Sequence, residues 1–245
     1  MELFPTTFGP AATRARTRSY GSGTRRVQTL IAAAGLAWLC LACFFNLTPQ
    51  AQAQDRRVKL VVFGDSLSAG QGLPAAEAFP AKLAGALKAK GLAVDVADAG
   101  VSGDTTSGGL GRLDWSVPEG TDAVIVELGA NDALRGVDPK ITRAALDNIL
   151  RRLRERGVEV LLAGMQAPRN LGEDYARSFD AIFPELAATH NVLFYPFFLD
   201  GVATDAKLNQ RDGMHPNATG VDVIVARVLP KVEELVIRVR RKSPS

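Results

Sequence analysis

The sequence predicts an α/β protein of three layers, in which helices cover both faces of a five-stranded, mainly parallel sheet. From residue 58 onward, short continuous runs of valine, leucine and isoleucine alternate with longer segments of helical periodicity. The runs mostly lack polar alternation, which is typical of parallel strands that are covered on both faces. With 245 residues, of which 47% are hydrophobic, the chain can bury the core of such a domain.

The elements follow in the order of five βα units. The predicted strands are the apolar runs at 58–63, 92–99, 122–129, 158–164 and 191–196. The predicted helices lie near 76–90, 106–114, 139–156, 173–189 and 216–238. Gly91 and Gly157 stand where helices should end, because glycine tolerates the left-handed backbone found there. Right-handed crossovers then give a single domain, for which we predict the flavodoxin-type strand order 2-1-3-4-5.

Residues 1–53 differ from the rest of the chain and predict an export signal. A basic segment precedes 16 uncharged residues at 30–45, and Ala51-Gln52-Ala53 has the small-x-small pattern of a cleavage site. We therefore expect the domain at 54–245 to be periplasmic or secreted. An uncleaved membrane anchor is the alternative, although a span needs about 20 apolar residues. The pair Arg25-Arg26 leaves twin-arginine export open beside the general route.

Charge and cysteine content narrow the choice of partners. The formal charge is +3, and residues 1–53 supply +4 of it through five arginines and one glutamate, which leaves −1 for the domain. The domain therefore lacks the basic character that nucleic-acid binding requires. Cys40 and Cys43 both lie in the uncharged run, so the domain has no cysteine and needs no disulfide after export. No Cys/His spacing indicates a metal site.

The first predicted strand is followed by Gly64-Asp65-Ser66, at the sheet edge where ligands bind in such folds. Ser66 should stand at the start of a short helix, whose free N–H groups favour a developing negative charge. It is therefore a candidate nucleophile. The alternative is that Asp65 or Ser66 is simply the N-cap of that helix.

Two further strand ends carry candidate hydrogen-bond donors. Gly103 lies in a loop after the second strand, and its backbone N–H can approach a ligand closely because it has no side chain. Asn131 follows the third strand, and its amide can donate to an oxyanion, while Asp132 can cap the next turn. Taken alone, either segment is an ordinary loop or turn. Their recurrence at the same edge as Ser66 favours one common site.

The chain contains two histidines, and one of them completes a triad. His215 follows Asp212 by three residues, so the carboxylate can accept a hydrogen bond from the imidazole Nδ1. Ser66, His215 and Asp212 together predict a serine hydrolase, in which histidine takes the serine proton and aspartate stabilises the imidazolium. His190 lies between a helix and a strand without an acid in a similar relation. We expect it to be an exposed helix-end residue.

These blocks, in this order, resemble those of the SGNH or GDSL hydrolases, in particular the branch of secreted arylesterases, acyl-CoA thioesterase I and lysophospholipases. The resemblance implies a flavodoxin-like SGNH fold and an acyl-enzyme mechanism that needs neither metal nor cofactor. It implies that Asp65 organises the turn rather than serving as the triad acid. The implied catalytic residues are Ser66, Asp212 and His215, and the implied oxyanion hole consists of Ser66, Gly103 and Asn131.

The expected substrates are carboxylic esters or thioesters, such as aryl esters, acyl thioesters or lysophospholipids. Membrane lipids are therefore candidate substrates, and we expect the enzyme to be a monomer. Pro168 and Leu171 are candidates for an acyl-binding wall, although their segment also fits a plain surface loop. A carbohydrate O-deacetylase of the same family, a non-catalytic secreted binding module and a flavin carrier are the alternatives. Ser68 breaks the Gly-x-Ser-x-Gly elbow of α/β-hydrolases, and no dinucleotide-binding glycine motif follows the first strand.

Overall fold

The computed structural model describes residues 56–242, so the predicted export signal at 1–53 lies outside the described residues. Within them, five strands form one sheet in the order β2-β1-β3-β4-β5, and each neighbouring pair is parallel. The predicted α/β class and strand order are therefore confirmed. The strands are β1 (Val58–Gly64), β2 (Val94–Asp98), β3 (Ala123–Glu127), β4 (Glu159–Ala163) and β5 (Leu193–Tyr195).

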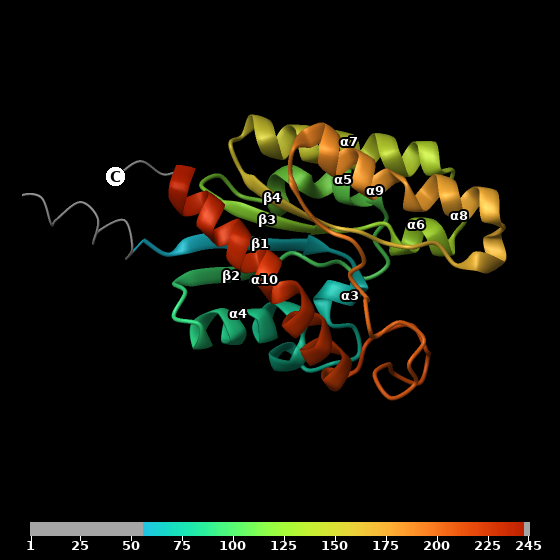
Figure 1. Ribbon diagram of the computed structural model, residues 1–245, viewed down its shortest axis with the longest axis horizontal. Helices are drawn as coiled ribbons and strands as arrows, with labels where there is room; N and C mark the ends of the chain where they lie inside the picture. The colour runs from blue at the N-terminus through green and yellow to red at the C-terminus, as the bar shows by residue number, and fades with distance from the viewer. Residues whose placement is uncertain (1–55, 243–245) are drawn as a thin grey trace, which may run out of the picture. The chain divides into compact units, whose positions relative to one another are not determined.

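Helices cover both faces of this sheet (Figure 1). On one face α4 (Phe79–Ala89) packs against α10 (Ala218–Lys242), and on the other α5 (Thr106–Ser116) and α9 (Ile182–His190) pack along α7 (Pro139–Glu155). Four short helices lie in the connections: α3 (Ser66–Ala69), η1 (Ala75–Glu77), α6 (Ala130–Leu134) and η2 (Arg169–Leu171). None of the helices within residues 56–242 is long and apolar enough to cross a membrane.

The helix predicted at 173–189 is in fact two helices, α8 (Glu173–Asp180) and α9, which meet at Ala181. Pro184 explains the break. In a continuous helix its missing N–H would leave the carbonyl of Asp180 without a donor, and its ring would crowd that carbonyl. In the first turn of a new helix the missing N–H costs nothing, because N–H groups there have no helical acceptor.

The apolar runs are buried on both faces, as the lack of polar alternation predicts. All five residues of β3 are buried, and Val62 and Phe63 of β1 are fully buried. The edge strand β2 is partly exposed. The register of the two central strands pairs Gly64 with Glu127, so β1 and β3 end side by side. The residues that follow each strand therefore enter the same region.

His190 is buried rather than exposed, so our expectation for its environment is wrong. Only 8% of the residue is accessible, and its Nε2 lies 2.7 Å from Oδ1 of Asp147 on α7. The last turn of α9 packs against α7, and a buried imidazole is stabilised by a polar partner. Because this contact lies just before β5 begins, it is at the opposite end of the strand from the predicted site and is structural.

Candidate active site

The turn after β1 presents Ser66 at the start of α3. Asp65 is the N-cap of this helix, since its Oδ1 accepts a hydrogen bond of 2.9 Å from the N–H of Leu67. The capping alternative therefore applies to Asp65, and the Ser66 hydroxyl is left for other contacts. Gly64 is required for space, because a Cβ there would collide with Ser68 and with Glu127. The turn that carries Ser66 is thus packed tightly against the end of β3.

The structure brings the three predicted triad residues together. Nε2 of His215 lies 3.0 Å from Oγ of Ser66, and Nδ1 lies 2.7 Å from Oδ2 of Asp212. The other carboxylate oxygen, Oδ1, accepts the backbone N–H groups of Met214 at 2.9 Å and of His215 at 3.0 Å. The hydrogen bonds from His215 and from these N–H groups lower the pKa of Asp212 to about 2. The carboxylate is therefore ionised and can stabilise an imidazolium.

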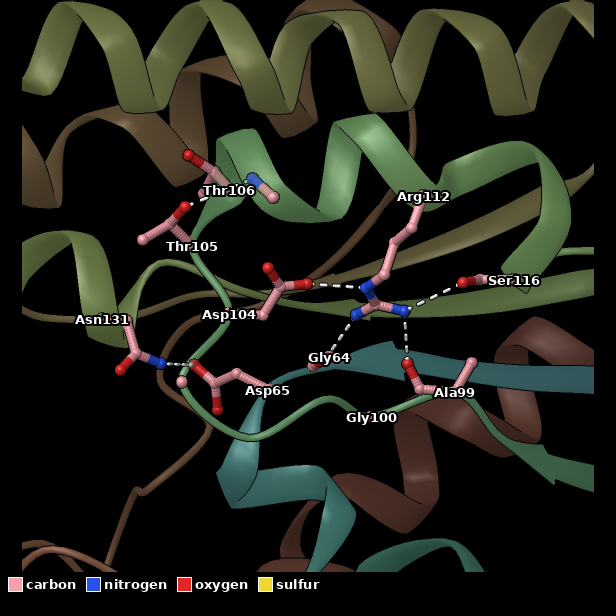
Figure 2. A network of polar contacts seen from close by, with 12 residues as sticks. Gly64, Asp65, Ala99, Gly100, Asp104, Thr105, Thr106, Arg112, Ser116 and Asn131 are labelled. Carbon is pink, nitrogen blue, oxygen red and sulfur yellow. Dashed lines mark hydrogen bonds and ion pairs between the residues drawn. The ribbon is translucent and has the colours of Figure 1, made fainter.

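The three predicted oxyanion donors line one cavity. Ser66 is the first residue of α3, so its N–H has no preceding helical carbonyl to bond. Gly103 has a φ of +81°, a left-handed conformation that strains other residues. Nδ2 of Asn131 donates to Oδ2 of Asp65 at 3.0 Å (Figure 2), and its second N–H remains for a ligand.

Asp132 does not cap its own turn, contrary to our expectation. It is fully buried, and its carboxylate accepts the N–H of Thr106 at 2.8 Å and the hydroxyls of Thr106 at 2.6 Å and Thr142 at 3.1 Å. These bonds tie α6, which carries Asn131, to the beginning of α5 and to α7. The reason is burial, because a carboxylate that is removed from water is stable only when nearby donors hydrogen-bond it.

Glu127 is a buried acid that our sequence reasoning missed. It ends β3 with no exposed surface, and its Oε2 accepts the N–H of Asp65 at 3.2 Å, while Oε1 has no hydrogen-bond partner in residues 56–242. Burial, and then the neighbouring charge of Asp65, raise the pKa of Glu127 well above its ordinary value. Burial also raises the pKa of Asp65 to about 6. The signal for Glu127 was a lone acid at the end of an otherwise apolar strand.

The triad opens into a cavity of about 570 Å³ with mostly apolar walls. Pro168 lines this cavity as predicted. Leu171 is not among the residues that line it, so its role in substrate binding stays a prediction. It lies at the end of η2, where the chain turns away and leaves it 37% exposed. The lining also includes the apolar residues Leu134, Met165, Phe197, Leu199 and Met214, none of which was singled out by number from the sequence.

The described part of the chain holds no group of three or more histidine, cysteine or acidic side chains that could bind a metal ion. A model of the GDSL-like lipase/acylhydrolase family matches residues 62–223, which contain the nucleophile turn, the donor loops and the Asp212–His215 pair. The chain belongs to the GDSL-like lipase/acylhydrolase family. As a member of this family it is a serine hydrolase that acts on ester bonds.

Relatives in the family agree with this assignment. An arylesterase of Vibrio mimicus is 40% identical over 179 residues, which cover 73% of this chain and 88% of the relative. Esterase TesA of Pseudomonas aeruginosa is 38% identical over 197 residues, which cover 80% of this chain and 96% of the relative. A crystal structure of a protein named TesA has a TM-score of 0.69 and 36% identity, covering 72% of this chain and 99% of that one.

A second solved structure comes from AlinE4, an SGNH-hydrolase family esterase. It has a TM-score of 0.62 and is 43% identical to this chain, covering 73% of it and 96% of that structure. The match to two SGNH-type structures confirms the predicted SGNH hydrolase fold. The family assignment also confirms the resemblance that the sequence blocks indicated.

Proposed function

We propose that the protein is an exported, monomeric esterase and thioesterase that hydrolyses small acyl esters through an acyl-serine intermediate on Ser66. One observation carries the proposal. A continuous hydrogen-bonded chain runs from Ser66 Oγ through His215 to Asp212 and opens into an apolar cavity that the three candidate oxyanion donors also line. Nucleophile, base, orienting acid and charge-stabilising groups thus meet at one place.

In the first half of the reaction, Ser66 Oγ attacks the carbonyl carbon of the substrate while His215 Nε2 takes the hydroxyl proton. The carbonyl oxygen becomes an oxyanion, which accepts hydrogen bonds from the N–H groups of Ser66 and Gly103 and from the amide of Asn131. The C–O or C–S bond then breaks, and His215 returns the proton to the leaving alcohol or thiol. In the second half, His215 deprotonates water, which attacks the acyl-serine. The bond from the acyl carbon to Ser66 Oγ then breaks, His215 returns the proton to Oγ, and the acid is released.

The substrate class follows from the cavity and from the relatives. Besides the arylesterase, a relative from Escherichia coli named thioesterase 1/protease 1/lysophospholipase L1 is 37% identical over 191 residues. These names support aryl esters, acyl thioesters and lysophospholipids as substrates of this chain. The mostly apolar cavity walls suit an acyl chain.

The test is a series of p-nitrophenyl esters, acyl-CoAs and lysophospholipids of increasing chain length. We expect hydrolysis by the wild type and a loss of about 10⁴-fold in kcat for Ser66→Ala and for His215→Ala. Ser178→Ala, which removes an exposed hydroxyl from α8, is the matched control and should keep full activity. Equal rates for the wild type and Ser66→Ala on every substrate would overturn the proposal.

Export is tested separately, by expressing the full-length chain and sequencing the N-terminus of the protein recovered from the periplasm and the medium. Cleavage after Ala53 predicts an N-terminus at Gln54. A protein that stays with the membrane and keeps residues 1–53 would show that this segment is an uncleaved anchor. Gel filtration of the processed protein tests the monomeric state.

A further inference from the structure

A buried arginine lies between two of the loops that supply the oxyanion donors. Arg112 is on α5, and only 8% of its side chain is exposed. Its Nη2 donates to the carbonyl of Gly64 at 2.8 Å, its Nη1 to the carbonyl of Ala99 at 2.8 Å and to Oγ of Ser116 at 3.1 Å, and its Nε to Oδ2 of Asp104 at 2.6 Å (Figure 2). All three guanidinium nitrogens are therefore engaged.

The partners of Arg112 lie next to the predicted donors in the chain. Gly64 is two residues before Ser66, and Asp104 directly follows Gly103. The β1–β2 register ends with Val62 opposite Asp98, and past it one further backbone hydrogen bond, of 3.0 Å, runs from the N–H of Val101 to the carbonyl of Gly64. In this region the guanidinium of Arg112 also bonds both chains, through the carbonyl of Gly64 before Ser66 and through the carboxylate of Asp104 after Gly103. The separation of two backbone N–H groups is thus set in part by one rigid side chain.

We propose that Arg112 is a positioning residue of the oxyanion hole, which fixes the N–H of Gly103 relative to the N–H of Ser66. The proposal rests on the proposed function of these donors. A planar guanidinium with five N–H groups satisfies two carbonyls and a carboxylate at once, whereas a lysine ammonium is a single point with three donors. Asp104, itself 12% exposed, supplies the charge that makes burial of this cation tolerable.

The effect on catalysis follows from the geometry that an oxyanion hole requires. Its donors stabilise the transition state only if they already point at the place where the charge develops. A displacement of about 1 Å can lower the rate by about 100-fold. Arg112 also lies over the ring of Phe63, with 4.3 Å from Cζ to the centroid, which holds the guanidinium against the end of β1. Its loss should therefore lower kcat and leave KM nearly unchanged.

The third donor has ties of its own. Asn131 is held by Asp65, and its helix is held through Asp132. Nη2 of Arg135, which follows that helix, donates to the carbonyl of Gly103 at 2.8 Å. Arg135 therefore still holds Gly103 when Arg112 is replaced, so the change should loosen the spacing of the Ser66 and Gly103 N–H groups without releasing Gly103, and it should leave the amide of Asn131 in place. Activity should fall by less than it does when the nucleophile is lost.

The experiment compares Arg112→Lys with the wild type in the full-length protein, using p-nitrophenyl butyrate and a fluorophosphonate probe. We expect kcat to fall about 10- to 100-fold with KM within about twofold, because a donor is displaced rather than deleted. Phosphonylation of Ser66 should slow in parallel, since the phosphonyl oxygen occupies the same hole. Arg156→Lys is the control. Its Nη2 donates to the carbonyls of Val117 and Pro118, before β3 begins, and kcat should not change.

Three outcomes would overturn the proposal: a kcat of Arg112→Lys within twofold of the wild type, a change in KM alone, or an equal loss in Arg156→Lys. If Arg112→Lys does not fold, Asp104→Asn decides, with a kcat at least threefold lower at unchanged KM supporting the proposal and an unchanged kcat contradicting it. Activity that survives in Ser66→Ala would instead show that the proposed function itself is wrong.

Discussion

The active site has two halves, the Asp212–His215 pair of the triad and the oxyanion hole, and they differ in how their residues are held. Asp212 and His215 lie three residues apart on one surface loop, where the Asp212 side chain is 38% exposed and held by local hydrogen bonds. The oxyanion half instead rests on three fully buried acids from two distant segments, Asp65 after β1, and Glu127 and Asp132 around the end of β3. The triad can use a solvated, ionised carboxylate to stabilise the imidazolium. The donors of the oxyanion hole must instead already be in place when the negative charge forms on the substrate.

The pKa values show the same contrast. Hydrogen bonds lower the pKa of Asp212 to about 2, whereas burial raises the pKa of Asp65 to about 6 and that of Glu127 well above its ordinary value. The triad acid is thus stabilised in its charged form by the fold. The acids beneath the nucleophile destabilise the fold when they ionise. The burial of Asp65 and Glu127 near the nucleophile therefore lowers the free energy of unfolding at any pH at which these acids are ionised.

The largest effect should come from breaking the exposed half. Asp212→Asn removes the charge that stabilises the imidazolium and favours the wrong tautomer of His215, so kcat should fall about 10³- to 10⁴-fold. Asp205→Asn is the matched control, because Asp205 makes a similar local bond, of 2.8 Å, to the N–H of Lys207. Steady-state kinetics on p-nitrophenyl butyrate measure both variants. A loss below tenfold in Asp212→Asn would show that Asp212 is not the triad acid.

A smaller effect should come from removing one donor of the buried half. Asn131→Ala should lower kcat about 10²- to 10³-fold with little change in KM, since the amide acts mainly in the transition state. Asn148→Ala is the control, because its side chain bonds within α7, where Nδ2 donates to the carbonyl of Ala144 and Oδ1 accepts from Nη2 of Arg151, and the residue is not part of the cavity lining. A rise in KM at unchanged kcat would assign Asn131 to substrate binding instead.

The smallest effect concerns stability and pH. The folded-state pKa of Glu127 lies above its ordinary value of 4.5, so above pH 4.5 the unfolded chain releases this proton and the folded protein keeps it. The contribution of Glu127 to the free energy of unfolding should therefore fall as pH rises from 4.5 to its folded-state pKa, by up to about 1.4 kcal/mol per pH unit. Glu127→Gln has no proton to lose and should lack this slope.

Urea unfolding of the wild type and Glu127→Gln between pH 4.5 and 8 measures the difference. The variant should gain stability relative to the wild type as pH rises. Glu159→Gln, which alters an ion pair with Lys242 at the surface, should run parallel to the wild type. Identical pH slopes for Glu127→Gln and the wild type would mean that the buried acid titrates normally.

How far the sequence predicted the site also differs between the two halves. The Asp212–His215 pair is visible in the sequence because its partners are three residues apart, and Ser66 is visible because polar residues interrupt an apolar run. Glu127 and Arg112 were missed. The importance of Glu127 depends on its register opposite Gly64, and that of Arg112 on the packing of α5 over two strand ends. No local pattern contains either contact.

The fold shows the same limit. Continuous apolar runs predicted all five strands, because burial on both faces favours apolar residues at every position of a strand. No run contains the strand order, which was predicted from the flavodoxin type of fold and is confirmed. Pro168 lines the cavity and Leu171 does not, since neighbours in the chain can face different surroundings after a tight turn. The break between α8 and α9 was missed although Pro184 marked it, because hydrophobic periodicity continues across the junction.

The most direct test of the nucleophile is to react the native protein with a fluorophosphonate and locate the adduct by peptide mass spectrometry. Ser66 should carry a single label, and the label should be absent from heat-unfolded protein and from Ser66→Ala, because only the folded site activates the hydroxyl. A label on Ser68 or Ser102, or equal labelling of folded and unfolded protein, would contradict the assignment of Ser66 as the activated serine.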